Sequence, residues 1–139
     1  MSNSALQPNL LIIVDDSPFD LRINSGIAKH TNLFKEILCF SSAQATFDFL
    51  AENINNPEIH PHLIFLDIQM PEMDGFEFMA QYDRFPAEFK RKSKVVMLSS
   101  TDDMGDIAKA HSDKNIFKLL KKPLNIEELK EVVTSIYPI

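Results

Sequence analysis

The sequence is poor in several features that large classes of protein require. It has a single cysteine, Cys39, which excludes an intramolecular disulfide framework and a cysteine-rich zinc site. No apolar run approaches the roughly 18 residues of a membrane span, and the longest clean one is Leu10–Val14. The opening residues Met1–Ser4 lack the basic and apolar regions of a secretory signal. These absences predict a soluble, cytoplasmic protein.

Positive charge is also scarce. Fourteen Lys and Arg residues against 20 Asp and Glu give a formal net charge of −6, the wrong sign for a domain whose main task is to bind DNA. Three glycines, eight prolines and 45% hydrophobic residues describe neither a disordered nor a fibrous chain. The length of 139 residues is that of one domain with a self-supporting core.

Five apolar segments of four or five residues recur along the chain and are rich in Val, Ile, Leu and Phe. Such segments are typical of strands that are buried on both faces of a parallel sheet. The last segment is the weakest candidate because Lys118 interrupts it. The five predicted strands are Leu10–Val14, Ile37–Phe40, Leu63–Leu66, Val95–Leu98 and Ile116–Leu120.

Between and after these strands, apolar residues recur at the three- and four-residue spacing of a helix. The first helix is expected to bury Phe19, Ile23 and Ile27, which step by four. The third helix must end before Pro86, and Asn125 is the expected N-cap of the last. The five predicted helices span residues 19–27, 43–54, 76–80, 104–111 and 126–136.

Strand and helix alternate five times. This order predicts an α/β fold of the flavodoxin-like, doubly wound (βα)5 type, with a five-stranded parallel sheet and five helices distributed over its two faces. Two polar connections, Asn53–His62 and Pro86–Lys94, are expected to be loops.

Ligands of open parallel sheets bind at the carboxyl ends of the strands, near the point where the strand order reverses. An aspartate at such a place is usually a helix cap or a turn residue. Here, however, several polar groups follow the predicted strands and should meet at one edge of the sheet. They are Asp15, Asp16, Asp67, Ser99, Ser100, Lys121 and Lys122.

Carboxylates gathered at one edge repel one another, and two of them about 5 Å apart cost roughly 3 kcal/mol at an effective dielectric constant of about 20. Asp15, Asp16 and Asp67 are therefore costly together unless a cation lies among them. Hard oxygen ligands without histidine or cysteine suit Mg²⁺, which keeps several waters and needs only one or two carboxylates. The sequence predicts a Mg²⁺ site at this edge.

The same residues lie in four blocks that resemble the receiver domain of two-component response regulators. The blocks are Val14–Asp16, Asp67–Gly75, Leu98–Ser100 and Lys122–Pro123, and the second is the most specific. Within it, Gly75 is expected to adopt a backbone φ that other residues resist. The resemblance implies a single receiver domain over residues 1–139, with a core from about 9 to 136.

The resemblance implies a metal-binding role for four residues. Asp16 corresponds to the direct Mg²⁺ ligand of the acidic pair, and Asp15 to the partner that acts largely through water. Asp67 and the backbone carbonyl of Gln69 complete the implied metal site.

It also implies which groups handle the phosphoryl group. Asp67 corresponds to the phospho-accepting aspartate, Lys122 to the lysine that pairs with the phosphoryl oxygens, and Ser99 to the switch position. The Ser99 hydroxyl and the backbone amide after Asp67 are the expected hydrogen-bond donors to those oxygens.

Two features complicate the comparison with the family. Lys121 and Lys122 are adjacent, and Pro123 favours Lys122 as the functional lysine, with a cis bond between Lys122 and Pro123. Position 119 usually holds an aromatic residue and is Leu119 here; Phe117, two residues earlier, is expected on the same face of the strand.

The implied function is that of a response regulator, not an enzyme, that receives a phosphoryl group from a sensor histidine kinase or a histidine phosphotransfer protein. With no DNA-binding or catalytic domain expected, output passes to an unknown protein through the face built by residues 104–111, 116–120 and 126–136. Two alternatives are a Mg²⁺-dependent phosphohydrolase with an Asp nucleophile, and a scaffold that never takes phosphate. The first is disfavoured because strand one ends Asp15-Asp16-Ser17 rather than Asp-x-Asp, and the second because no site residue is missing.

The remaining reactive side chains have simpler interpretations. The four histidines lack metal-ligand spacing, and His111 is expected to pack on the apolar face of its helix. Cys39 lies in the middle of a predicted strand and is expected to be a buried, inert thiol.

Overall fold

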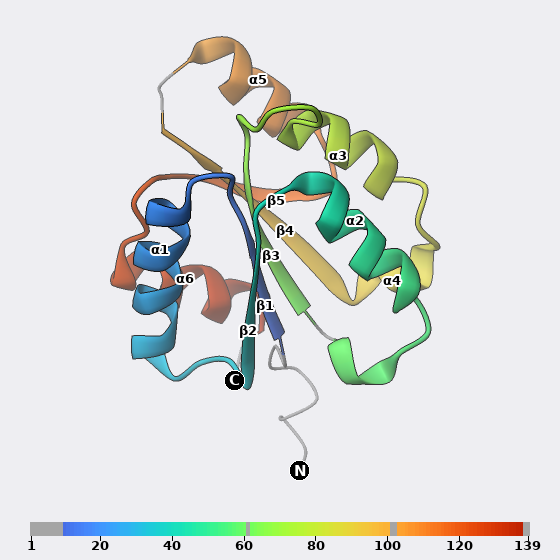
Figure 1. The fold of residues 1–139 in the computed structure, drawn as a ribbon, viewed down its shortest axis with the longest axis horizontal. Coiled ribbons are helices and arrows are strands. Elements are labelled where there is room, and N and C mark those ends of the chain that lie inside the picture. The colour runs from blue at the N-terminus through green and yellow to red at the C-terminus, as the bar shows by residue number, and fades with distance from the viewer. Residues whose placement is uncertain (1–9, 61, 101–102, 138–139) are drawn as a thin grey trace.

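The computed structural model of the chain describes residues 10–60, 62–100 and 103–137, so the predicted core boundary at Asn9 lies outside the described residues. Its strands are β1 (Leu10–Val14), β2 (Glu36–Phe40), β3 (His62–Asp67), β4 (Ser93–Ser99) and β5 (Ile116–Lys121). They form one parallel sheet in the order β2-β1-β3-β4-β5 (Figure 1). All five predicted strands are confirmed, and all but β1 extend beyond the predicted bounds.

Helices cover both faces of this sheet. They are α1 (Pro18–Thr31), α2 (Ala43–Glu52), α3 (Gly75–Tyr82), α4 (Ala87–Arg91), α5 (Met104–Ser112) and α6 (Ile126–Ile136), with a 3₁₀ helix, η2, at Pro57–Ile59. In Figure 1, α1 and α6 lie on one side of the sheet and α2 to α5 on the other. None of the helices in the described ranges is long and apolar enough to cross a membrane.

The central strands are buried on both faces, as the continuous apolar segments predict. In β1, Ile12 and Val14 belong to the apolar cluster under α2 and α3, whereas Leu11 and Ile13 belong to the cluster under α1 and α6. All five residues of β1 are buried. Successive side chains of a strand point to opposite faces, so one apolar run supplies both clusters.

Short polar side chains begin the helices that border the carboxyl edge of the sheet. Ser17, Asp74, Asp103 and Asn125 cap α1, α3, α5 and α6, and each accepts hydrogen bonds from backbone N–H groups of the first turn. An N-cap of this kind typically contributes about 1 kcal/mol and sets where the helix begins. The predicted cap Asn125 is confirmed.

The prediction that Pro86–Lys94 is a loop is wrong, because this stretch contains α4, so the described residues form six α-helices rather than the five predicted. Phe85 and Phe89 lie four residues apart, are both buried, and pack with ring centroids 4.7 Å apart. Their contact anchors a helix among polar residues. The other predicted loop, Asn53–His62, contains η2, and its last residue opens β3.

Three side chains that were expected to pack inward are exposed. Phe19 is 69% exposed because α1 turns Asn24, not Phe19, towards the core. Cys39 is exposed because β2 is an edge strand. His111 is exposed because the neighbouring Ala110, and not His111, is the α5 residue turned into the core.

A register shift in β5 overturns the expectation that Phe117 and Leu119 share a face. Val95 pairs with Ile116 but Val96 pairs with Lys118, so Phe117 is an extra residue in the strand. Ile116 and Leu119 both pack against the same cluster, three residues apart, and Phe117 is 43% exposed. A bulge of this kind interrupts the two-residue alternation of side chains.

Gly75 is required by close packing rather than by its backbone φ. Among the described residues, no glycine has a positive φ, and the left-handed position in the loop after β3 belongs to Glu72, with φ 69°. A Cβ on Gly75 would lie 2.8 Å from the carbonyl oxygen of Asp67 and 3.0 Å from the Cα of Ile68. The Gly75 N–H donates to the Ile68 carbonyl at 2.8 Å, so α3 begins directly against the end of β3.

We therefore expect Gly75→Ala to lower the free energy of unfolding by about 1–3 kcal/mol, the usual cost of overpacking, because the obstructing atoms belong to backbone. Urea unfolding measures the change. Gly26→Ala is the matched control, since a Cβ there meets nothing within 4 Å and alanine favours a helix interior by about 0.5–1 kcal/mol. A loss of stability in Gly26→Ala equal to that in Gly75→Ala would contradict the packing argument.

Candidate functional site

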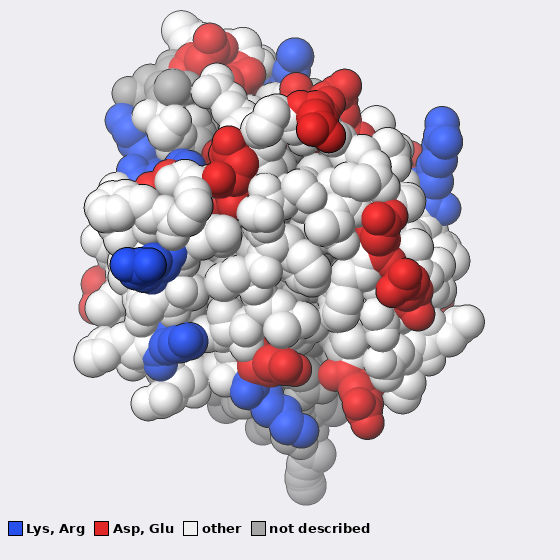
Figure 2. Space-filling view, in the orientation of Figure 1, with Lys and Arg blue, Asp and Glu red and all other residues white. Residues whose placement is uncertain are grey.

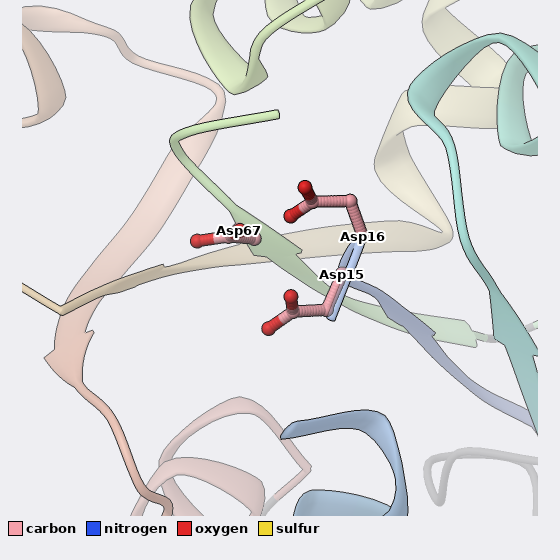
Figure 3. A group of neighbouring side chains, drawn as sticks. All are labelled: Asp15, Asp16 and Asp67. Atoms are coloured by element: carbon pink, nitrogen blue, oxygen red, sulfur yellow. The ribbon is translucent and has the colours of Figure 1, made fainter. Parts of the chain in front are cut away.

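The candidate site lies where the strand order reverses, at the carboxyl ends of β1 and β3. β1 lies between β2 and β3, and Asp15 and Asp16 follow it directly, while Asp67 is the last residue of β3. One ligand oxygen from each of the three carboxylates falls within 4.8 Å of the others. Figure 3 shows the two β1 carboxylates and Asp67 reaching into the same space beyond the strands. The predicted acidic cluster is present in the structure.

Lys122 is the cation of this cluster. Its ammonium Nζ lies 2.8 Å from Asp15 Oδ2, 2.9 Å from Asp20 Oδ2 and 3.4 Å from Asp67 Oδ1. The side chain is only 10% exposed, so these ion pairs are largely shielded from water. The neighbouring Lys121 is exposed. Of the two adjacent lysines, Lys122 is therefore the one that meets the carboxylates.

Asp20 is a fourth carboxylate at the site, and it is not among the residues predicted from the sequence. It lies in the first turn of α1, where its N–H donates to the Ser17 hydroxyl at 3.2 Å. A signal was available, because Asp20 is the only acidic residue of that turn and follows Asp16 by four positions. The contact with Lys122 joins residues 102 positions apart and cannot be read from local spacing.

Asp15 is held by both of its carboxylate oxygens. Oδ1 accepts from the Ser17 N–H at 2.9 Å, and Oδ2 accepts from Lys122. The side chain is fully buried, whereas that of Asp16 is exposed. The two adjacent aspartates therefore have different surroundings: Asp16 faces solvent, whereas both oxygens of Asp15 accept hydrogen bonds from protein groups.

Two further predicted site residues are Ser99, which contacts Lys122, and Gln69, which follows Asp67 by two residues. Ser99 ends β4, is 6% exposed, and its carbonyl accepts the Lys122 N–H at 2.8 Å, so the predicted switch residue and the lysine are neighbours. Gln69 is exposed in the loop after β3. The backbone amide after Asp67 does not fit its expected role, because the Ile68 N–H already donates to the Leu98 carbonyl at 3.1 Å.

The loop from β5 to α6 has the predicted cis bond between Lys122 and Pro123. The next residue is also tied to α1, since the Leu124 N–H donates to Asn24 Oδ1 at 3.1 Å in a buried contact. Asp20 and Asn24 are four residues apart on α1 and so lie on one side of that helix. Together they hold the two residues that flank Pro123.

Burial and like charge disfavour the ionised form of Asp67. Burial raises the pKa of Asp67 most, and the negative charge of Asp15 raises it further. Lys122 lowers this pKa but does not cancel the increase, so the pKa of Asp67 is raised to about 6. Burial alone would lower the pKa of Lys122, but hydrogen bonds to Asp15 and Asp20 outweigh burial and raise this pKa. Lys122 is thus a permanent cation in an electronegative pocket.

The donor set fits a hard divalent cation. Three carboxylate oxygens within 4.8 Å of one another offer the oxygen ligands that Mg²⁺ prefers. In the described part of the chain, no other group of three or more metal-binding side chains meets the same distance limit. His60 and His62 have ring centroids 5.0 Å apart, but they lie at the amino end of β3, at the opposite edge of the sheet.

Comparison with known proteins agrees with this fold. The model of the response regulator receiver domain family matches residues 11–134. Response regulator Rcp1 of Synechocystis sp. is 30% identical over 139 residues, which cover 98% of this chain and 91% of that protein. The similarity therefore extends over almost the whole length of both.

Solved structures show the same relationship. A response regulator receiver protein from Dyadobacter fermentans has 36% identity and a TM-score of 0.84, with 94% of this chain and 98% of that chain covered. The Mn²⁺-bound form of response regulator Rcp1 has 26% identity and a TM-score of 0.69, with 93% and 91% covered. The second of these structures, that of Rcp1, contains a bound divalent cation.

The raised pKa of Asp67 makes stability depend on pH. Since its pKa in the fold is about 6 and an unfolded aspartate titrates near about 3.9, its contribution to stability is fully present below about pH 4 and is lost as the pH rises through 6. We expect Asp67→Asn, in EDTA, to raise the free energy of unfolding by about 1–3 kcal/mol at pH 7.5 and by almost nothing at pH 4.

Urea unfolding at the two pH values measures the difference. Asp83→Asn is the control, because hydrogen bonds from Asn115 and Lys90 lower the pKa of that exposed carboxyl, so its removal should cost stability at pH 7.5. An equal gain from Asp67→Asn at both pH values would show that burial of the charge is not its cause.

Proposed function

The chain belongs to the response regulator receiver domain family, and on this premise we propose that it accepts a phosphoryl group on Asp67 and signals through phosphorylation-dependent protein contacts. The carrying observation is the Asp67 carboxylate, whose side chain is 6% exposed, which is grouped with Asp15 and Asp16 and lies 3.4 Å from the Lys122 ammonium. The proposed donor is a sensor histidine kinase or a histidine phosphotransfer protein, and the proposed place of action is the cytoplasm.

In the proposed step, an oxygen of Asp67 forms a bond to phosphorus as the bond from phosphorus to the donor atom breaks. Lys122 donates hydrogen bonds to the phosphoryl oxygens and balances part of their charge. Ser99 donates its hydroxyl to another of these oxygens. A carboxylate is a weak nucleophile, so positioning and charge balance supply most of the acceleration.

Asp15, Asp16, Asp67 and the backbone carbonyl of Gln69 are the proposed holders of Mg²⁺. When bound, Mg²⁺ supplies the positive charge that offsets these carboxylates and the incoming phosphoryl group. The exposed Asp16 is suited to direct coordination, since it can exchange water for the metal. Asp15 is suited to act through water, because both of its oxygens already have protein partners.

The proposed output is to another protein, through the face built by α5, β5 and α6, rather than to DNA. Exposed apolar side chains on this face, Met104 at 83% and Phe117 at 43%, favour a protein partner. The net charge of −6 opposes binding to a phosphate backbone. On the face drawn in Figure 2, basic side chains of the described residues are scattered among acidic and uncharged ones.

The first test is phosphorylation by acetyl phosphate, followed by intact-mass spectrometry. We expect one added phosphoryl group in the native protein with Mg²⁺, almost none in EDTA, and almost none in Asp67→Asn. Asp48→Asn, an exposed aspartate on α2, is the control and should be labelled like the native protein. Equal labelling of Asp67→Asn and the native protein would refute Asp67 as the acceptor, and turnover of a phosphate ester such as p-nitrophenyl phosphate would favour the phosphohydrolase.

The second test concerns the switch. Leu119 has no ring or hydroxyl and less volume than an aromatic residue, so the free-energy difference between its inward and outward positions is smaller than for an aromatic side chain. Phe117 cannot take this role because the bulge displaces it. We propose that the signal runs from Ser99 into α5 and leaves β5 almost unchanged. Adding beryllofluoride with Mg²⁺ should change amide shifts strongly at 103–106 and weakly at 117–120; the reverse ranking would contradict this route. Leu119→Tyr should increase the response of β5 and leave labelling of Asp67 unchanged.

A further inference from the structure

The Asp20 carboxylate competes for the lysine on which the proposed function depends. The Lys122 ammonium has three N–H donors, and two of them reach Asp15 Oδ2 at 2.8 Å and Asp20 Oδ2 at 2.9 Å. Asp67 Oδ1 is farther away, at 3.4 Å. In this state Lys122 is therefore bound more closely by Asp15 and Asp20 than by the phospho-acceptor.

Solvent exposure distinguishes the three carboxylates around Lys122. The side chain of Asp15 is 0% exposed and that of Asp67 is 6% exposed, whereas that of Asp20 is 34% exposed. A carboxylate that loses its cation must be rehydrated or left as an uncompensated charge, and the second outcome is costly for a buried group. Asp20 can regain water most easily, so it is the partner that can release Lys122 at the lowest cost.

Asp20 is nevertheless well placed to hold Lys122. Ser17 caps α1 and fixes the Asp20 backbone, and Pro18 begins the same turn. One turn later, Asn24 accepts from the Leu124 N–H at 3.1 Å, which ties the loop after Lys122 to the same side of α1. The contact is thus part of a two-point attachment between α1 and the β5–α6 loop.

From this geometry we propose that Asp20 is a positioning residue that holds Lys122 in a resting position and competes with the phosphoryl group for it. On phosphorylation, one N–H of the Lys122 ammonium stops donating to the Asp20 carboxylate and donates to a phosphoryl oxygen instead, and water hydrates the Asp20 carboxylate. Asp20 thereby opposes the phosphorylated state. The inference rests on the proposed function of Asp67 and adds to it a residue that sets how readily the site is filled.

The test is a titration of the full chain with beryllofluoride in Mg²⁺, followed by amide chemical shifts. Asp20→Asn keeps an oxygen that can accept from Lys122 but removes the competing charge. We expect half-saturation at a concentration about three- to fivefold lower than in the native protein, the range expected of a partly exposed ion pair. Unchanged or weaker binding would overturn the proposal, and weaker binding would show that Asp20 presents Lys122 to the phosphoryl group instead.

Two further variants separate this role from a general charge effect. Glu128→Gln removes the same charge from the same capping position of α6, where Glu128 is exposed, and should change half-saturation by less than the Asp20 variant. In a Lys122→Gln background, Asp20→Asn should have no further effect, because the competitor acts through that lysine. An equal gain in Glu128→Gln, or a gain that persists without Lys122, would refute the mechanism.

A second measurement needs no phosphoryl analogue. The ¹⁵N-labelled side-chain ammonium of Lys122 should exchange its hydrogens slowly in the native protein with Mg²⁺, and faster in Asp20→Asn. If the native protein does not bind beryllofluoride at all but this difference is seen, the proposed function fails while the resting contact stands. If the native protein binds it and the ammonium exchanges equally in both proteins, only the role of Asp20 fails.

Discussion

The ion pairs of the Lys122 ammonium are the interaction on which the arrangement of carboxylates at the carboxyl edge of the sheet depends. Asp15 is fully buried and Asp67 nearly so, and each would be an uncompensated buried charge without a cation nearby. One side chain, 10% exposed, pairs with both and also with Asp20. An excess of negative charge remains, and this is the charge that the proposed divalent cation offsets.

The parallel ladder brings these groups together without any need for a flexible loop. Val14 pairs with Leu66, and Ser99 pairs with Lys121, so the residues that end or follow neighbouring strands reach the same edge. Apolar clusters on both faces of the sheet limit access of water to the strand ends. Electrostatic interactions are stronger where water is excluded, and the raised pKa of Asp67 is one consequence.

The backbone also connects the charged site to the proposed signalling face. The Lys122 N–H donates to the carbonyl of Ser99, so the lysine and the switch residue belong to one hydrogen-bonded unit between β4 and β5. In the proposed signalling route, a movement of Ser99 therefore also displaces Lys122. The bulge at Phe117 lies nearer the amino end of β5. Ile116 and Leu119 are the residues of β5 that pack against the apolar cluster under α2 and α3, and Leu119 is the nearer of the two to Lys122 in the chain.

Local patterns in the sequence were sufficient for the strands of the sheet and for the acidic cluster, whereas the choice of Lys122 over Lys121 came from the resemblance to receiver domains and from the adjoining Pro123. A strand buried on both faces must be apolar throughout, so each central strand is visible as a run, and the polar residue that ends the run marks the functional edge. The short helix α4 was not predicted, because its apolar pattern consists only of Phe85 and Phe89 within a charged stretch. Gly75 was identified correctly as special, but its reason is contact with the Asp67 backbone and not its φ.

The sequence by itself determined which residues form strands and which polar groups follow them, because these depend on burial along a few consecutive positions. Only the tertiary structure decided that Asp20 and Asn24 hold the loop around Pro123, that Cys39 lies exposed on β2, and that Phe117 bulges from β5. Each of these depends on which helix packs beside which strand and on which strands form the edges. The contacts of Asp20 and Asn24 join residues 102 and 100 positions apart. The exposure of Cys39 and the bulge at Phe117 depend instead on how the strands pair, Ile13 with Cys39 and Val95 with Ile116. No local pattern of side chains contains either kind of information.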